Sequence, residues 1–218
     1  MTPVAASATA AAAKSNNLVR GLFVVYLVMW TAMAISPIDR MDWLLENVLV
    51  FAFSGVLVST HRNFQFSNLS YVLIFLFLSL HLTGAHYTYG QVPFGNWLKD
   101  SFRLDRNHFD RVAHFSFGLL CAYPIRELFI RKTKVQPLWS YYLPIETILA
   151  FSAFFELLEA WIAKLVAPEL AKQYLASQGD VWDTQNDMAV ALAGCCLAMG
   201  ITALWHRITG GEPAQDAA

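Results

Sequence analysis

Apolar residues along this chain gather into long runs that are separated by polar segments. Runs of this kind cover residues 18 to 36, 43 to 60, 69 to 88, 108 to 130, 141 to 164 and 183 to 206. About 17 to 25 mostly apolar residues in a helix suffice to cross the hydrocarbon core of a membrane. The pattern therefore predicts an all-α fold, a polytopic membrane protein built as a bundle of about six transmembrane helices.

The two ends of the chain differ from this bundle in composition. Residues 1–17 are alanine-rich and of low complexity, so we expect a disordered cytoplasmic tail there. Residues 18–207 form the expected transmembrane domain, and residues 208–218 form a second disordered tail. A cleaved signal peptide is the alternative for the first apolar run, because the segment 32–34 has the small-x-small form of a cleavage site.

Composition supports the membrane assignment and excludes one class of partner. Hydrophobic residues make up 56% of the chain, charged residues only 14%, and the mean hydropathy is +0.43. These values are typical of an integral membrane protein with lipids as its surroundings. The net charge of −1 lacks the positive field that nucleic-acid binding requires. The three cysteines lie in apolar runs, which indicates packing residues.

Basic residues indicate the orientation of the bundle in the membrane, and most acidic residues lie on one side of it. Basic residues from Arg126 to Lys134 are the strongest cytoplasmic marker, which predicts that both termini are cytoplasmic. Most of the 16 acidic residues then fall at the opposite helix ends. They are Asp39, Asp42, Glu46, Asp100, Asp105, Asp110, Glu156, Glu159, Glu169, Asp180, Asp183 and Asp187. We therefore expect polar residues from separate helices to meet at one depth.

In three of the predicted helices, pairs of polar residues are spaced so that both members lie on the same helix face. The pairs are Asp110 with His114, Glu156 with Glu159, and Asp183 with Asp187. Residues three or four positions apart lie on one face of a helix. The face of Asp187 continues through the small residues Ala191 and Gly194, which favour close approach of another helix. These carboxylates are therefore expected to face protein rather than lipid.

Acidic residues in this region outnumber the cationic side chains available to pair with them. An ionised side chain costs about 2.5 to 3.5 kcal/mol at mid-membrane, so carboxylates beyond those paired with Arg106 and Arg111 require protons or a cation. The sequence does not choose between these two, and a divalent cation is the cofactor that the cluster would hold in the second case. Its predicted ligands are His86, Asp110, His114, Glu156 and Asp187, with Glu159 or Asp183 as a catalytic base. Arg106, Arg111, Asp180 and Asn186 complete the predicted polar cluster.

Simpler interpretations exist for several of these residues. Asp183 is equally well placed as a helix N-cap, and Asp180 beside a glycine as a turn residue. His81 is typical of a hydrogen-bonded core histidine, and His86 fits either interpretation. Aromatic residues near the helix ends are typical of a belt at the membrane interface. They include Tyr87, Tyr89, Trp97 and Trp182.

Five motifs occur in the following order along the chain: HYTYGQVPFG, RNHFDRVAHFSFG, Arg126-Glu127, FFELLEAW and QGDVWDTQNDM. Together they resemble the YjdF family of bacterial inner-membrane proteins over residues 20 to 205. The chain is also similar to VanZ-like proteins. The motif positions of that family would be filled here by Asp110, Arg111, His114, Phe115, Glu156, and Asp183 with Asn186. The resemblance implies a multi-pass protein of the bacterial inner membrane and no defined reaction.

Three functions remain open from the sequence. The first is an envelope-related accessory protein that binds a lipid or an ion. The second is a metal-assisted or acid–base membrane enzyme with a lipid-linked or envelope substrate. The third is a proton- or ion-coupled transporter, in which buried acids act as a relay. Oligomeric state does not follow from the sequence, because small-residue faces such as that of Gly194 serve internal packing and dimerisation alike.

Overall fold

The computed structural model describes residues 3–166, 168–175 and 177–210, without the side chains of residues 3–16, 172 and 173. Within these residues the chain forms eight helices and no strand. The helices are α1 (Pro3–Met33), α2 (Arg40–Thr60), α3 (Asn68–His86), α4 (Pro93–Phe102), α5 (Phe109–Thr133), α6 (Pro137–Ala163), α7 (Pro168–Tyr174) and α8 (Asp183–Thr209). The predicted all-α membrane fold is confirmed.

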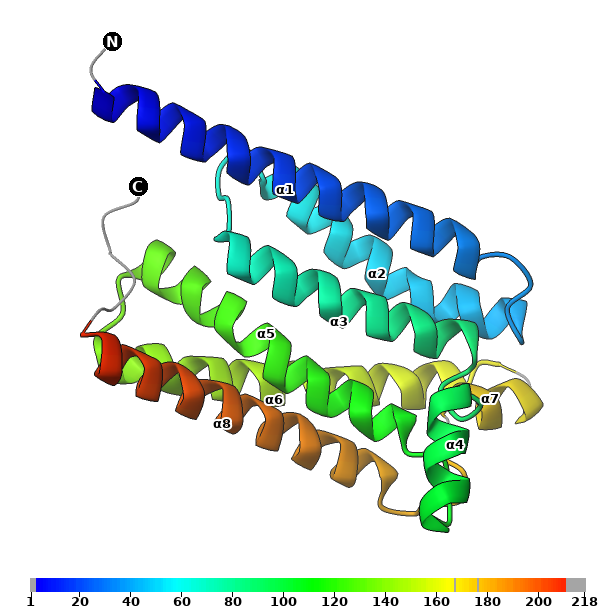
Figure 1. Cartoon of the computed structure of the whole chain (residues 1–218). Coiled ribbons are helices and arrows are strands. Elements are labelled where there is room, and N and C mark those ends of the chain that lie inside the picture. Colours follow the sequence, from blue (N-terminus) through cyan, green and yellow to red (C-terminus); the bar gives the residue numbers. More distant parts are fainter. Residues whose placement is uncertain (1–2, 167, 176, 211–218) are drawn as a thin grey trace.

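Six long helices, α1, α2, α3, α5, α6 and α8, lie close to the six predicted apolar runs (Figure 1). By length and composition, three of the described helices, α2, α3 and α8, are apolar enough to cross a membrane. Asn17–Met33 is a shorter apolar helical stretch. Helix α5 carries charged residues at both of its ends, which lowers its mean hydropathy. The number of six spans stays a prediction.

The start of the chain differs from the expected tail. Helix α1 begins at Pro3, where the sequence had predicted a disordered segment. Alanine has the highest helix propensity of all residues, so an alanine-rich segment extends an adjacent helix at little energetic cost. At the other end α8 continues to Thr209, and Gly210 ends it in the left-handed conformation with φ 66°. The remainder of the predicted C-terminal tail, 211–218, lies outside the described residues.

Two short helices occupy the long polar connections. Helix α4 lies between α3 and α5, and α7 lies between α6 and α8 (Figure 1). Pro93 begins α4, where a missing backbone N–H carries no penalty. Both short helices sit at one end of the bundle, the end opposite the two termini (Figure 1).

Small residues bring α5 and α8 into close contact. A Cβ atom added at Gly118 would overlap the carbonyl oxygen of Ala191, and one added at Gly194 would overlap that of Phe115. Cys195 is buried in the core cluster at this contact, as is Cys121. The two helices that carry most of the predicted ligands are therefore held against each other backbone to backbone.

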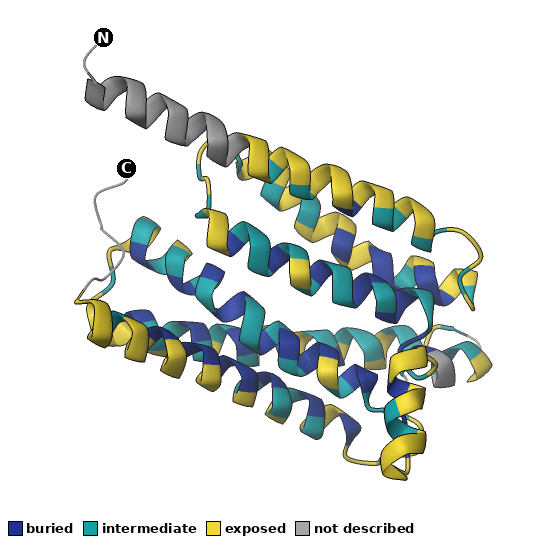
Figure 2. Cartoon of the chain, viewed as in Figure 1, coloured by how far each residue is buried: buried dark blue, intermediate teal, exposed yellow. Residues whose placement is uncertain are grey.

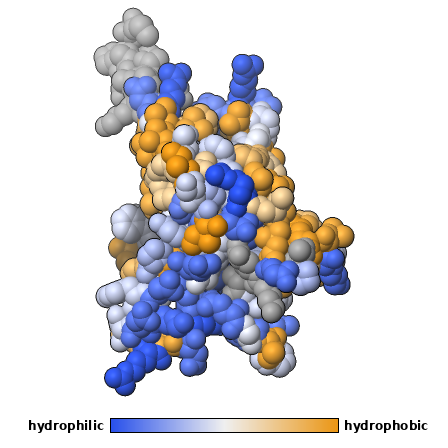
Figure 3. Space-filling model, turned by 90° about the vertical axis from the view of Figure 1, so that its right-hand side faces the viewer, coloured by the Kyte–Doolittle hydropathy of each residue, from blue (hydrophilic) through white to orange (hydrophobic). Residues whose placement is uncertain are grey.

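Buried and exposed residues divide the long helices into an inner and an outer side. Buried positions line the interior of the bundle, while exposed positions follow its outer surface (Figure 2). Many exposed side chains are large and apolar, including Val28, Val58 and Leu197, as expected for contact with lipid. Seen from the end that carries α4 and α7, hydrophilic side chains cover much of the face and apolar ones flank it (Figure 3).

Candidate functional site

The acidic helix ends meet where α4 and α7 lie. The starts of α2, α5 and α8 and the ends of α3 and α6 all point to this end of the bundle (Figure 1). Antiparallel neighbours place the end of one helix beside the start of the next. Residues far apart in the sequence therefore share one level.

Asp110 and His114 of α5 and Asp187 of α8 form the closest group of potential metal ligands, called here the Asp-His-Asp group. One ligand atom from each lies within 4.8 Å of those of the other two. His114 Nε2 is 3.7 Å from Asp110 Oδ1 and 3.5 Å from Glu156 Oε1 of α6. All four side chains are buried. The helical spacing of Asp110 and His114 thus places both on the face that meets α8.

Two arginines bind the aspartates around the start of α8. Arg106 Nη1 donates to Asp183 Oδ1, and Arg111 Nη2 donates to Asp180 Oδ2 at 2.5 Å and to Asp183 Oδ1 at 3.1 Å. Arg111 Nε is 3.1 Å from Asp187 Oδ1 as an ion pair, but the hydrogen-bond angle is poor and neither atom has a hydrogen-bond partner. Asp187 therefore keeps an oxygen that is buried and weakly paired.

The segment before α8 is shaped by Asp180. Its Oδ1 accepts the backbone N–H of Trp182 at 2.9 Å, and its Oδ2 accepts a bond from Asn186 Nδ2 at 3.3 Å. The Trp182 N–H, and after it Arg111, hold the pKa of Asp180 below its usual value. Trp182 is the N-cap residue of α8 and makes no side-chain cap. Asp183 is thus an ion-pair partner rather than an N-cap, and Asp180 has the turn-forming role.

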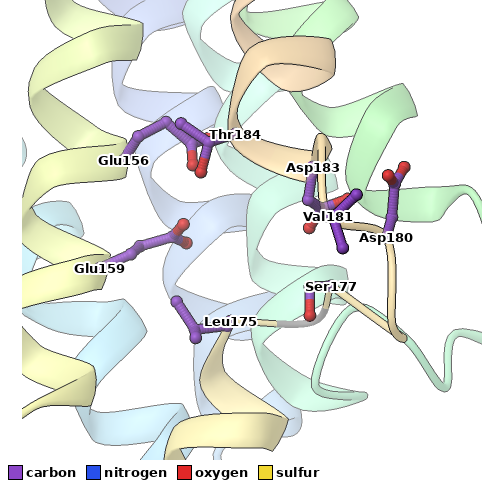
Figure 4. Close-up of a pocket in the computed structure, with 8 residues that line it drawn as sticks. All are labelled: Glu156, Glu159, Leu175, Ser177, Asp180, Val181, Asp183 and Thr184. Carbon is purple, nitrogen blue, oxygen red and sulfur yellow. The ribbon is translucent and has the colours of Figure 1, made fainter.

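A small cavity of about 130 Å³ opens beside the Asp-His-Asp group. It is lined by Glu156, Glu159, Leu175, Ser177, Asp180, Val181, Asp183 and Thr184 (Figure 4). The Glu159 carboxylate of α6 points into it, and the Glu156 carboxylate lies beside Thr184 (Figure 4). This arrangement places carboxylates and hydroxyls around a space that is large enough for a few water molecules or a small polar group.

His86 lies apart from the Asp-His-Asp group, although the sequence had placed it among the ligands. Its Nδ1 is 2.8 Å from the carbonyl oxygen of Met33 at the end of α1, and its ring packs on Tyr87. His81, five residues earlier, points about 140° away from it around the helix at 100° per residue. His86 therefore connects α3 to α1 while His81 faces the bundle interior.

A second set of buried polar residues, which sequence reasoning missed, lies between α2, α3 and α7. It consists of Asp42, Glu46, His81, Tyr89 and Tyr174. The Tyr89 hydroxyl is 2.5 Å from His81 Nδ1, so Tyr89 is buried and is not part of an aromatic belt. Trp97 and Trp182 are exposed, as a belt requires. Asp42 and Glu46 show the same four-residue spacing as the pairs on α5 and α8, and that spacing was the available signal.

Asn107 and Gln178 join the loop that carries Arg106 to the segment that carries Asp180. The Asn107 N–H donates to Gln178 Oε1 at 3.0 Å, and Gln178 Nε2 donates to the Asn107 carbonyl at 2.8 Å. The Asn107 side chain also donates to the Val92 carbonyl and accepts the Phe109 N–H. This buried amide fixes the start of α5, and hence Asp110, relative to the segment before α8.

Comparisons with known proteins agree with the membrane architecture. A family model described as "Predicted membrane protein (DUF2238)" matches residues 18–208. The chain is 36% identical over 173 residues to the inner membrane protein YjdF of Escherichia coli strain K12, covering 79% of this chain and 82% of that protein. No solved structure matches the chain. The resemblance to VanZ-like proteins stays a prediction. With the family model covering nearly all of the described helices, the chain belongs to the YjdF family of inner-membrane proteins.

Proposed function

We propose that this chain is an ion-binding protein of the bacterial envelope, in which the Asp-His-Asp group holds one divalent cation. The observation that carries the proposal is the convergence of three buried ligand atoms within 4.8 Å of one another. They come from two helices that pack backbone to backbone, so the group is held by the core of the bundle.

The donor atoms suit a transition metal or zinc. One imidazole nitrogen and two carboxylates are a set that Zn²⁺ and Mn²⁺ accept, with ligand bonds of about 2.0 to 2.2 Å to zinc. Tetrahedral ligands at that bond length lie about 3.3 Å apart, so small side-chain rotations would close the Asp-His-Asp group around an ion. Glu156, whose Oε1 is 3.5 Å from His114 Nε2, is placed to be the fourth ligand.

The charge balance also favours a cation. Arg106 and Arg111 bind Asp183 and Asp180 closely, which leaves Asp110, Glu156 and Glu159 without an arginine or lysine ion pair among the described residues. Unpaired carboxylates in a region of low polarity are strongly disfavoured. A divalent ion between α5 and α8 would offset this charge and join the two helices.

The cavity beside the group favours a second candidate, a metal-assisted or acid–base enzyme. Glu159 points into this cavity and is the residue best placed to take a proton from a bound water (Figure 4). A lipid-linked or envelope substrate would reach the cavity from the membrane face that carries α7. In this scheme Asp183, which is ion-paired with both Arg106 and Arg111, does not act as a base. It instead holds the segment before α8 in position.

Metal content of the purified protein tests the proposal. The full chain in lipid nanodiscs would be loaded with Zn²⁺ or Mn²⁺, freed of excess ion and assayed by elemental mass spectrometry. We expect about one ion per chain, and its loss in Asp110→Asn, His114→Gln and Asp187→Asn, because each removes one of the donors the ion requires. Glu146→Gln on α6 is the matched control, since Glu146 is exposed and bonds only Tyr142 among the described residues.

Thermal unfolding of the same samples separates a cation site from a structural network. A bound ion raises the melting temperature of the unmutated protein and not that of Asp187→Asn. A protein that takes up no stoichiometric ion, and whose variants melt lower with or without added metal, would instead have a purely structural polar cluster.

A further inference from the structure

Among the described residues, Asp42 and Glu46 on α2 are the most deeply buried acidic pair outside the Asp-His-Asp group. Their exposed fractions are 1% and 3%. Asp42 Oδ1 and Glu46 Oε2 have no hydrogen-bond partner. Among the described residues no lysine or arginine pairs with either, and Arg40 at the start of α2 turns away to the Ala34 carbonyl. Two buried carboxyl groups thus lack a compensating positive side chain among those that the structure describes.

Among the residues whose side chains the structure describes, the groups that face this pair are neutral or acidic. Asp39 caps the start of α2, and Tyr174 of α7 covers the pair. His81 of α3 has its Nε2 3.3 Å from the Glu46 carbonyl oxygen and 3.9 Å from Glu46 Oε2. Glu159 of α6 and Asp110 of α5 interact electrostatically with Glu46. Two further acids therefore add to the negative charge around the pair.

The contacts of His81 are those of a neutral ring. Its Nε2 faces the backbone carbonyl oxygen of Glu46, which can only accept, so Nε2 carries a proton. Its Nδ1 lies 2.5 Å from the Tyr89 hydroxyl, which can supply the proton of that contact and leave Nδ1 an acceptor. A ring that accepts at one nitrogen and donates at the other is a neutral imidazole.

Either a second cation or bound protons could satisfy the two carboxyl groups. The only group of three potential metal ligands with converging atoms among the described residues is the Asp-His-Asp group, so this pair offers too few donors for an ion. Protons need no such set of ligands. The geometry therefore favours Asp42 and Glu46 as neutral acids while the neighbouring site is empty of cation.

We infer that Asp42 and Glu46 form a proton-binding pair whose protons are released when a cation occupies the Asp-His-Asp group. This inference rests on the proposed function. A cation beside Asp110 stabilises nearby carboxylates, so the O–H bonds of the pair dissociate, each carboxyl group keeps the electron pair, and the protons pass to solvent. Binding is reciprocal, and acid therefore weakens the affinity for the cation.

Titration calorimetry of the full chain in nanodiscs counts the released protons. Zn²⁺ or Mn²⁺ is titrated at one pH in two buffers of different ionisation enthalpy, and the difference in heat gives the number of protons. We expect Asp42→Asn and Glu46→Gln each to lower that number by up to about one, since each removes one titrating group. Glu146→Gln, the same substitution at the far end of α6, leaves it unchanged.

Two outcomes overturn the inference, and they are distinguishable. Binding of the metal with an unchanged proton count in both α2 variants removes the inference and leaves the proposed function standing. Absence of binding to the unmutated protein removes both.

Infrared difference spectra, metal-loaded minus metal-free, can be recorded on the unmutated protein. This readout therefore holds even if the variants of Asp42 and Glu46 fail to fold. We expect loss of a protonated-carboxyl carbonyl band, and a smaller loss in Asp42→Asn. A spectrum without such a loss contradicts the inference.

Discussion

Asp180, Asp183 and Asp187 occupy one short stretch of sequence and three different environments. Asp180 is partly exposed and forms a turn, Asp183 is buried between two arginines, and Asp187 is 1% exposed and weakly paired. At the scale of the residue, position relative to the start of α8 separates the carboxylates that are structural partners from the one that we propose as an ion ligand. Depth below the helix start is the physical difference.

Acid should loosen the segment before α8 through Asp180. The pKa of this carboxyl is held below its usual value by the Trp182 N–H and by Arg111, so the folded state favours the ionised form. Its contribution to stability is present above the ordinary aspartate pKa of about 3.9 and is lost as pH falls through the lower folded value. We expect faster hydrogen exchange of residues 177–186 at low pH, after correction for intrinsic exchange rates.

The variant Asp180→Asn removes this titration, so its exchange in that segment should vary much less with pH. Asp100→Asn, on the exposed side of α4, is the matched control and should behave as the unmutated chain. Equal pH dependence in Asp180→Asn and in the unmutated chain would contradict the assignment of this ion pair.

The pairing of α5 with α8 is the element-scale feature on which the site depends. Gly118 and Gly194 let the two backbones meet, and the ligand group draws Asp110 and His114 from one helix and Asp187 from the other. A change in the separation of these helices would therefore alter stability and the proposed metal binding together.

Adding one methyl group at this contact should separate the helices. Gly118→Ala and Gly194→Ala each place a Cβ against a backbone carbonyl that cannot rotate away, and such overpacking costs about 1 to 3 kcal/mol of the free energy of unfolding. Thermal or denaturant unfolding in detergent measures the loss. Gly200→Ala on α8 meets nothing within 4 Å and should be neutral or stabilising by up to about 1 kcal/mol. Equal effects at Gly194 and Gly200 would argue against the close contact.

At the scale of the whole molecule, the start of α1 and the end of α8 lie at one end of the bundle, and α4 and α7 lie at the other (Figure 1). The polar cluster belongs to the end that carries α4 and α7. An even number of spans gives this arrangement. The basic residues Arg131 and Lys132 end α5 at the side of the termini, which favours a cytoplasmic location of that side. The candidate site would then face the outer side of the inner membrane.

Labelling of introduced cysteines tests this orientation. With the three native cysteines replaced, Asp100→Cys on α4 should react with a membrane-impermeant maleimide in intact spheroplasts. Lys134→Cys, just after α5, should react only after the membrane is opened. The reverse pattern would place the termini outside and the site on the cytoplasmic face.

Hydrophobic runs in the sequence were sufficient to locate the long helices, and spacing was sufficient to put Asp110 with His114 and Asp183 with Asp187 on shared faces. Helix formation and lipid exposure depend on local composition and periodicity, which a sequence contains directly. Helices α4 and α7 were not predicted, because each is short and depends on docking to the bundle for its stability.

The rotation of each helix about its axis was decided only by the tertiary structure. That rotation turned His86 toward the end of α1, brought Asp42 and Glu46 of α2 inward, and buried Tyr89 against His81. The sequence by itself determined which side chains share a face, since the helical period fixes this locally. Packing between helices determined which faces meet, because that choice depends on the shapes and charges of residues distant along the chain.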